Sequence, residues 1–266
     1  MTSSYADILK RVDAAISAAR EIFARFTPGA IDAEFKAGHD PVTDADRAID
    51  VALRKNLLRD GEGWLSEESV DNFSRLEKCH VWVVDPLDGT REFVKGIPEF
   101  CVSIGYVENG RPVVGGIYNP ATHETFIGAV DSGVLYNGQP ARASARQNLA
   151  GTSVLASRSE VKRGEWKKFE NGPFEITAMG SVAYKLARVA AGLADITFTL
   201  TPKNEWDVAA GAALVLSGGG FITTLENGEF RANNRNTLLS GLIAGGPNLR
   251  EELLSLLGPH LRPTAL

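Results

Sequence analysis

The 266-residue chain has few of the residues that build disulfide frameworks or zinc sites. Its two cysteines, Cys79 and Cys101, match neither a disulfide framework nor a pair of metal ligands, so we expect free, buried thiols in a reducing compartment. Its four histidines form no HxH or HxxxH pair, which argues against a zinc site.

Long apolar runs and an excess of positive charge are missing as well. No stretch approaches the ~18 apolar residues of a membrane span, and residues 1–20 carry charges throughout, without the apolar core of a signal peptide. The net charge of −5 argues against general binding to nucleic acid or to membrane surfaces. The hydrophobic fraction of 44% and the charged fraction of 23% are ordinary for a globular protein. We therefore expect a cytoplasmic protein that neither spans nor binds a membrane.

The first half of the chain combines two helical patterns with a series of strand patterns. Residues 4–19 and 43–60 repeat apolar residues at helical spacing, and the pair Ser4 and Asp7 resembles a capping box. The continuous apolar run at 80–85 predicts a strand that is buried on both faces. The strand-like runs that follow are joined by Asn-Gly pairs, which are hairpin signals.

The second half of the chain alternates between strand and helix patterns. The polar stretch 157–172 is expected to face solvent. The whole pattern predicts a layered α/β (α+β) protein, a single domain over 1–266 with lobes at about 1–148 and 149–266. Strands are predicted at 152–157, 174–179, 194–200, 220–225 and 238–246, and helices at 181–192, 207–219 and 248–257.

The stretch VVDPLDGTREF, residues 83–93, places two carboxylates at the end of an apolar run. Pro86 lacks a backbone donor and favours an extended Asp85, so the strand is predicted to end at Asp85. Gly89 permits a tight turn, and Thr90 can begin a short helix whose first amides are free. Carboxylate oxygens suit Mg²⁺ and helix-start amides suit phosphate, so this stretch can hold both a metal and its anion. For two acids alone, a capped turn is the simpler interpretation.

Other acids lie at the ends of predicted elements far away along the chain. Taken alone, Asp207 is explained by helix capping, but its helix is apolar and rich in Ala and Gly, which favours a ligand in a place with little water. Because histidines are few, these acid clusters favour Mg²⁺ over zinc. The acids are Asp40, Asp44 and Asp46 in DPVTDADRA, Glu67 and Glu68 in SEES, and Asp207 in NEWDVAAG.

These stretches resemble the inositol monophosphatase superfamily of Mg²⁺-dependent phosphatases, which includes bisphosphate nucleotidases and relatives of fructose-1,6-bisphosphatase. WVVDPLDGT is similar to the family motif W-x-x-D-P-[IL]-D-G-T, and EWDVAAG is similar to W-D-x-A-[AG]-G. DPVTDAD and SEES match two upstream elements in the same order, so the similarity runs from about residue 36 to 220. The resemblance implies a layered αβαβα sandwich, a homodimer, and a small phosphorylated metabolite as substrate.

The resemblance also implies a role for individual residues. Two or three Mg²⁺ ions would activate a water molecule, with no covalent intermediate. Glu67 and Thr90 would orient and deprotonate that water, and Asp46 would support Thr90. The implied metal ligands are Glu67, Asp85, the Leu87 carbonyl, Asp88 and Asp207, and the implied phosphate and substrate contacts are Asp88, Gly89, Thr90, Gly180, Ser181 and Asp207.

The substrate stays open between three interpretations. GIYNP and IPEFCVSIG are similar to inositol monophosphatases, which favours an inositol phosphate or similar sugar phosphate. DGTREF resembles the D-G-T-K-E-F of 3′(2′),5′-bisphosphate nucleotidases, and Leu200 stands where inositol enzymes commonly carry a glutamate, which favours 3′-phosphoadenosine 5′-phosphate. A non-catalytic regulatory protein on the same fold is the third interpretation. Four cations, Arg91, Lys95, Lys185 and Lys203, are available for a second phosphate but are expected to be surface charges.

Overall fold

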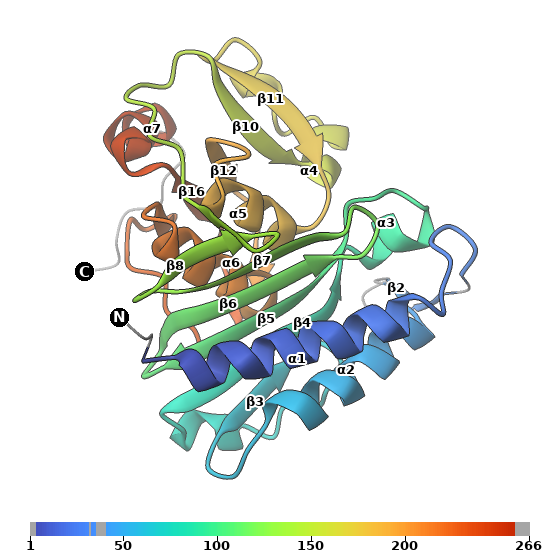
Figure 1. Cartoon of the computed structure of the whole chain (residues 1–266). Helices are drawn as coiled ribbons and strands as arrows, with labels where there is room; N and C mark the ends of the chain where they lie inside the picture. The colour runs from blue at the N-terminus through green and yellow to red at the C-terminus, as the bar shows by residue number, and fades with distance from the viewer. Residues whose placement is uncertain (1–3, 32, 36–40, 259–266) are drawn as a thin grey trace.

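Two large β-sheets, two short strand pairs and the helices around them make up the structure (Figure 1), a computed structural model that describes residues 4–31, 33–35 and 41–258. Asp40 and the first residues of the family similarity, 36–40, lie outside the described residues. The larger sheet has the order β3-β4-β5-β6-β7-β8-β9, and the second has the order β11-β10-β12-β16-β14.

The strands of the larger sheet are β3 (Gly63–Ser66), β4 (His80–Asp88), β5 (Cys101–Glu108), β6 (Arg111–Asn119), β7 (Glu124–Ala129), β8 (Gly133–Tyr136) and β9 (Gln139–Ala141). The second sheet contains β10 (Thr152–Ser157), β11 (Phe174–Met179), β12 (Ile196–Thr199), β14 (Phe221–Thr224) and β16 (Leu242–Gly245). Two short pairs are β1 (Glu34–Phe35) with β2 (Pro41–Val42) and β13 (Lys203–Asn204) with β15 (Leu238–Leu239).

The helices are α1 (Ala6–Phe23), α2 (Asp44–Leu57), α3 (Thr90–Val94), α4 (Arg158–Lys162), α5 (Val182–Ala190), α6 (Glu205–Ser217) and α7 (Arg250–Leu257). Short 3₁₀ turns lie at Ser74–Glu77, Lys167–Phe169 and Pro247–Leu249.

The layers follow the order helix, sheet, helix, sheet, helix. Helices α1 and α2 cover one face of the larger sheet, and α5 and α6 lie against its other face (Figure 1). Helix α5 also contacts β12 and β16 of the second sheet, whose far side packs with α7. This arrangement confirms the predicted layered αβαβα sandwich. Among the described residues, no helix is both long and apolar enough to cross a bilayer.

The apolar run of β4 explains how the larger sheet is buried on both faces. Val81 and Val83 belong to the core shared with α5 and α6, whereas Trp82 and Val84 belong to the core under α1 and α2. Successive side chains of a strand point to opposite faces. The prediction of a strand buried on both faces is therefore confirmed.

Three predicted boundaries are wrong because tertiary contacts override local signals. Helix α1 has no side-chain cap, since Ser4 bonds to the Asp131 carboxylate instead of to its own helix. Strand β4 continues past Asp85 to Asp88, with an irregular register at the proline. The predicted strand 238–246 breaks at Gly241, whose left-handed backbone (φ +153°) lies against the Thr199 carbonyl.

The two sheets use different parts of the chain. The larger sheet ends with β9 and the second begins with β10. This change of sheet supports our proposal of one domain with lobes that divide near residues 148–149.

The two cysteines differ from each other in burial. Cys101 is buried, as expected, but Cys79 is exposed, so the expectation of two buried thiols is wrong for Cys79.

Candidate metal and phosphate site

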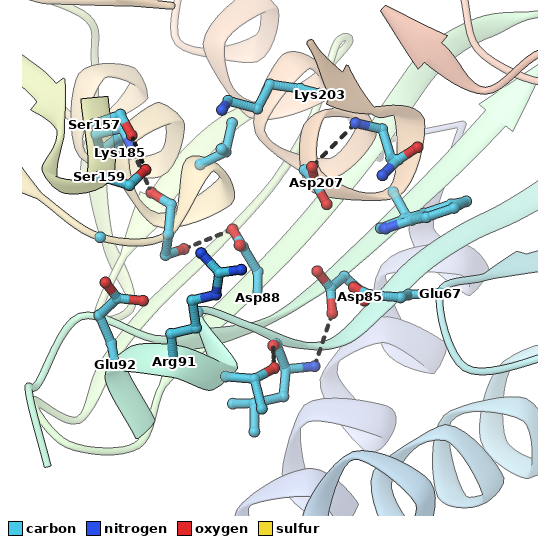
Figure 2. Close-up of a pocket in the computed structure, with 18 of the residues that line it drawn as sticks. Glu67, Asp85, Asp88, Arg91, Glu92, Ser157, Ser159, Lys185, Lys203 and Asp207 are labelled. Carbon is cyan, nitrogen blue, oxygen red and sulfur yellow. Dashed lines mark hydrogen bonds between the residues drawn. The ribbon is translucent and has the colours of Figure 1, made fainter. Parts of the chain in front are cut away.

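A cleft of about 260 Å³ lies where the ends of β3 and β4 meet the beginnings of α3, α5 and α6. Figure 2 shows Glu67, Asp85 and Asp207 on one side of the cleft and Ser157, Ser159 and Lys185 on the other, with Lys203 near Asp207 and Glu92 on the side of the serines. Among its lining residues are Glu67, Asp85, Leu87, Asp88, Gly89, Thr90, Gly180, Ser181 and Asp207, which sequence analysis had selected.

Three carboxylates from distant parts of the chain converge in the cleft. Oxygen atoms of Glu67, Asp85 and Asp207 all lie within 4.8 Å of one another. Glu67 follows β3, Asp85 lies in β4, and Asp207 lies in the first turn of α6. The structure therefore brings together acids that are up to 140 residues apart, as the sequence pattern predicted for a metal site.

The electrostatics of this trio fit a divalent cation. Burial raises the pKa of Asp85 well above its usual range, and the nearby charges of Glu67, Asp88 and Asp207 raise it further. Burial and the charges of Asp88 and Glu67 raise the pKa of Asp207 in the same way. Carboxylates that repel one another in a buried place either take up protons or share a cation. An all-oxygen donor set of this kind suits a hard ion such as Mg²⁺.

Asp207 is the third residue of α6, so the helix begins two residues before the predicted 207–219, and Asp207 takes part in its capping box without being the N-cap residue. Asn204 is the N-cap residue, and its backbone N–H donates to the Asp207 carboxylate at 3.1 Å in a capping box. This bond uses one carboxylate oxygen and fixes the side chain at the helix start. Asp207 is thereby directed toward Asp85 (Figure 2).

Asp88 lies beside the trio and joins the end of β4 to the start of α5. Its Oδ2 accepts hydrogen bonds from the Ser181 hydroxyl and the Ala183 N–H, each at 2.7 Å. Burial raises the pKa of Asp88, and these two bonds oppose that shift. Ser181 has a positive φ of 55°, a conformation that side chains rarely adopt and that often occurs at functional sites. The structure thus brings the predicted substrate residues Ser181 and Asp88 into contact.

Thr90 and Asp46 meet on the other side of Asp85. The Thr90 hydroxyl lies 3.2 Å from Asp46 Oδ1 and 2.9 Å from the Leu87 carbonyl oxygen, and it can donate to either. Burial raises the pKa of Asp46, whereas hydrogen bonds from Thr43 and Thr90 oppose that shift. The pairing of Thr90 with Asp46 is the one that the sequence resemblance implied.

Gly89 sets the turn that directs Thr90 into the cleft. Its backbone has φ +97°, and an added Cβ would lie 2.8 Å from the Glu99 carbonyl oxygen. Only glycine adopts such a conformation without strain and allows this close approach. The turn lets α3 begin at Thr90 directly after β4.

The cationic side chains of the cleft were underestimated from sequence. Lys185 is only 4% exposed, so its interpretation as a surface charge is wrong. Its Nζ donates to the Ser181 carbonyl at 2.8 Å, and burial lowers its pKa to about 8. Lys203 also lines the cleft and lies 3.3 Å from the buried carboxylate of Glu160.

The polar stretch 157–172 largely faces solvent, as predicted, although Glu160 and Trp166 in it are buried and the half-exposed Arg158 has a structural role. Arg158 donates from Nε to Glu99 at 2.8 Å, and the Gly180 N–H donates to the same carboxylate at 2.6 Å. These contacts hold the wall of the cleft around Gly180. Sequence reasoning missed both partners; the one available signal was that Arg158 directly follows a strand.

Leu200 does not lie among the residues that line this cleft. It lines a separate pocket whose wall combines aromatic side chains, such as Trp166 and Phe198, with charged ones, such as Glu160. Leu200 stands where inositol enzymes commonly carry a glutamate. In the described part of the chain, this position therefore directs no carboxylate at the acidic trio.

Comparisons with known proteins agree with this geometry. Residues 5–261 match the inositol monophosphatase family. The chain is 33% identical to an inositol-1-monophosphatase of Mesorhizobium japonicum over 233 residues, covering 84% of this chain and 85% of that protein. An inositol monophosphatase structure from Anabaena has a TM-score of 0.80 at 26% identity and covers 98% of both chains. The structure of CysQ from Bacteroides thetaiotaomicron has a TM-score of 0.75 at 27% identity and covers 91% of this chain and 98% of that one.

Proposed function

Because the chain belongs to the inositol monophosphatase family and is a phosphoric monoester hydrolase, we propose that it releases phosphate from a small phosphorylated metabolite with the help of Mg²⁺. The observation that carries this proposal is the convergence of Glu67, Asp85 and Asp207 within 4.8 Å. These three carboxylates, with Asp88 and the Leu87 carbonyl, would hold two or three ions. When bound, Mg²⁺ supplies activation of water and neutralises charge on the phosphoryl group.

The chain's own residues would prepare the attacking water. The Thr90 hydroxyl donates a hydrogen bond to Asp46 or to the Leu87 carbonyl. The Thr90 oxygen can therefore accept a hydrogen bond from a water molecule in the cleft. Glu67 also lines the cleft and would orient that water and receive its proton. In this scheme Asp46 acts by fixing the direction of the Thr90 hydroxyl.

The phosphate would be held by the turn after β4 and by the start of α5. The backbone N–H groups of Gly89 and Thr90 lie at the beginning of α3, where hydrogen-bond donors for an anion are available. Gly180 and Ser181 form the facing wall of the cleft. Donors that are fixed before the reaction stabilise the charge that develops on the transferring group.

For the substrate we propose an inositol phosphate or a similar sugar phosphate, which is what the names of the most similar relatives indicate for those proteins. One observation favours a second candidate. Lys185 and Lys203 both line the cleft, so a substrate with a second phosphate, such as 3′-phosphoadenosine 5′-phosphate, would find cations there.

Phosphate release from the purified full chain tests the proposal. With saturating Mg²⁺, we expect release from inositol monophosphate or from 3′-phosphoadenosine 5′-phosphate, and the ratio of kcat/KM values decides between them. Release from neither compound nor from other small sugar phosphates would contradict the proposed function.

Asp207→Asn tests the metal assignment. The amide keeps an oxygen that can accept the Asn204 N–H, so the helix cap survives. It removes the negative charge that a divalent ion requires, and we expect kcat to fall at least ~100-fold. Near-normal hydrolysis by this variant at saturating Mg²⁺ would refute a metal role for Asp207, and its circular dichroism spectrum serves as the folding control.

From the family resemblance we also propose a homodimer in a cytoplasmic compartment. Sedimentation velocity of the purified chain measures the first point directly. A single monomeric species at micromolar concentration would contradict it.

A further inference from the structure

Helix α2 presents two carboxylates that lie one helical turn apart, Asp46 and Asp50. Each accepts hydrogen bonds from hydroxyl groups of a different segment at the cleft. Asp46 pairs with Thr90. Asp50 pairs with Ser66 and Ser69, which lie on either side of Glu67 in the sequence SEES.

The contacts of Asp50 form a bracket, by which we mean Asp50, Ser66 and Ser69. The Ser66 hydroxyl donates to Asp50 Oδ1 at 2.6 Å, and the Ser69 hydroxyl donates to Oδ2 at 2.8 Å. The Ser66 oxygen in turn accepts the Glu68 N–H at 3.2 Å. Asp50 is 9% exposed and Ser66 is 3% exposed, so water competes little for the bond between them, whereas Ser69 is half-buried.

We propose that Asp50 is a positioning residue that sets the metal-binding carboxylate of Glu67 through this bracket. The inference rests on the proposed function, because it assigns Glu67 to the metal site. Short hydrogen bonds on both sides of Glu67 fix the main chain from which its side chain reaches the cleft, where its oxygen lies within 4.8 Å of Asp85 and Asp207. Partners of this kind, one shell behind the ligands, orient ligands and raise metal affinity.

The bracket holds the Glu67 segment against electrostatic repulsion. Without a cation, the charges of Asp85 and Asp207 repel a third carboxylate and push the Glu67 segment away from them. The main-chain N–H of Glu67 makes a long hydrogen bond to the neighbouring strand, 3.4 Å from the Val84 carbonyl oxygen. Asp46 and Asp50 are themselves like charges four residues apart, an arrangement that destabilises a helix. A role in helix stability therefore does not explain the second carboxylate.

The double variant S66A/S69A tests the proposal, and the chain offers a matched control. Beside the second sheet, the hydroxyls of Ser144 and Ser153 both donate to the Asp195 carboxylate, outside the residues that line the cleft. S144A/S153A therefore removes the same two kinds of bond from a buried carboxylate elsewhere. The readouts are the Mg²⁺ affinity of the full chain by titration calorimetry and the Tm in EDTA.

We expect S66A/S69A to weaken Mg²⁺ binding about tenfold and to raise the Mg²⁺ concentration for half-maximal phosphate release by a similar factor. At saturating Mg²⁺ kcat should recover to within about threefold of the unmodified chain, because the ligands themselves remain. S144A/S153A should lower the Tm in EDTA yet leave Mg²⁺ affinity within twofold. If the double variant fails to fold, S69A replaces it, with S69T, which keeps the hydroxyl, as the variant that restores affinity.

Unchanged Mg²⁺ affinity in S66A/S69A would overturn the proposal, and so would equal losses of affinity in the two double variants. These outcomes are separable from failure of the proposed function. If the unmodified chain binds Mg²⁺ but hydrolyses no phosphate monoester, the function is wrong while the affinity comparison still decides the role of the bracket. If the unmodified chain binds no divalent metal, both proposals are overturned.

Discussion

At the scale of single residues, Asp85 illustrates a conflict between stability and function. Its carboxylate is 2% exposed and lies among three other acids, and burial followed by their charges raises its pKa. A carboxyl whose pKa is raised by folding favours the protonated form in the folded state. The metal-free protein therefore becomes less stable as the pH rises above 3.8, the ordinary pKa of an aspartate such as Asp85. At neutral pH this charge destabilises the fold until a cation neutralises it.

Asp85→Asn separates these two effects. The amide oxygen can still accept the Leu87 N–H, which lies 2.9 Å from the carboxylate, while the charge is removed. We expect the Tm in EDTA at pH 7 to rise by about 3 °C. Added Mg²⁺ should raise the Tm of the unmodified chain but not that of the variant. A variant that is less stable in EDTA and still stabilised by Mg²⁺ would contradict the assignment of Asp85.

The residues of the acidic trio were predictable from sequence because carboxylates at the ends of apolar runs are conspicuous. Their hydrogen-bond partners were not. Ser181 meets Asp88 across 93 positions of the chain, and Arg158 meets Glu99 across 59. Such pairings depend on how separate elements approach one another, and no local pattern records that approach. Lys185 was misjudged for the same reason, since nothing in its own helix indicates the packing that buries it.

At the scale of elements, α6 places Asp207 because it packs very closely on the larger sheet. Gly105 and Gly115 of β5 and β6 face the backbone of Ala210, and a Cβ at Gly105 would lie 2.9 Å from the Ala210 nitrogen. At Gly115 a Cβ would clash with the Ala210 carbonyl oxygen. Small residues on both sides thus let the helix lie low on the sheet, and its first turn ends at the acidic trio.

Gly115→Ala should push α6 away from the sheet. We expect a loss of about 3 kcal/mol in the free energy of unfolding, because the clash is with main chain that cannot turn aside. The displaced helix start should also weaken Mg²⁺ binding through Asp207. Chemical denaturation and Mg²⁺ titration measure the two effects. Gly228→Ala is the control, since its Cβ would meet only the Thr224 hydroxyl at 3.5 Å, and a larger loss there than at Gly115 would contradict the packing argument.

The types of these elements were predictable, but several of their ends were not. The spacing of apolar residues identified α2 correctly, and the continuous apolar run identified β4 as a strand buried on both faces. The start of α1 was wrong because the backbone N–H and the hydroxyl of Ser4 both donate to Asp131, a residue far along the chain. Ends of elements depend on such single contacts, whereas the interior of an element repeats its signal many times.

At the scale of the whole molecule, a buried polar cluster joins the larger sheet to α5. Glu124 of β7 accepts hydrogen bonds from Tyr136 at 2.9 Å and from Tyr184 of α5, and Arg188 of the same helix lies 3.2 Å from it. Helix α5 also contacts the second sheet and begins at Ser181, which holds Asp88. The cluster therefore links the layers that together form the cleft.

Glu124→Gln tests this link and carries a defined pH dependence. Burial raises the pKa of Glu124, but hydrogen bonds from Tyr184, Tyr136 and Thr122 and the charge of Arg188 lower it more, so the net shift is downward. A lowered pKa contributes stability above the ordinary value of 4.5, and this stability is lost as the pH falls through the folded-state pKa.

Because glutamine cannot ionise, we expect Glu124→Gln to lose about 2 kcal/mol at pH 7, which for a chain of this size lowers the Tm by about 4–8 °C. The difference should shrink steadily below pH 4.5, as the unmodified chain itself becomes protonated at Glu124. Thermal unfolding across the pH range measures it. Glu165→Gln, which alters an exposed ion pair with Arg163, should change the Tm little at any pH. A Glu124→Gln deficit that is constant with pH would mean that packing, and not the charge of Glu124, joins the layers.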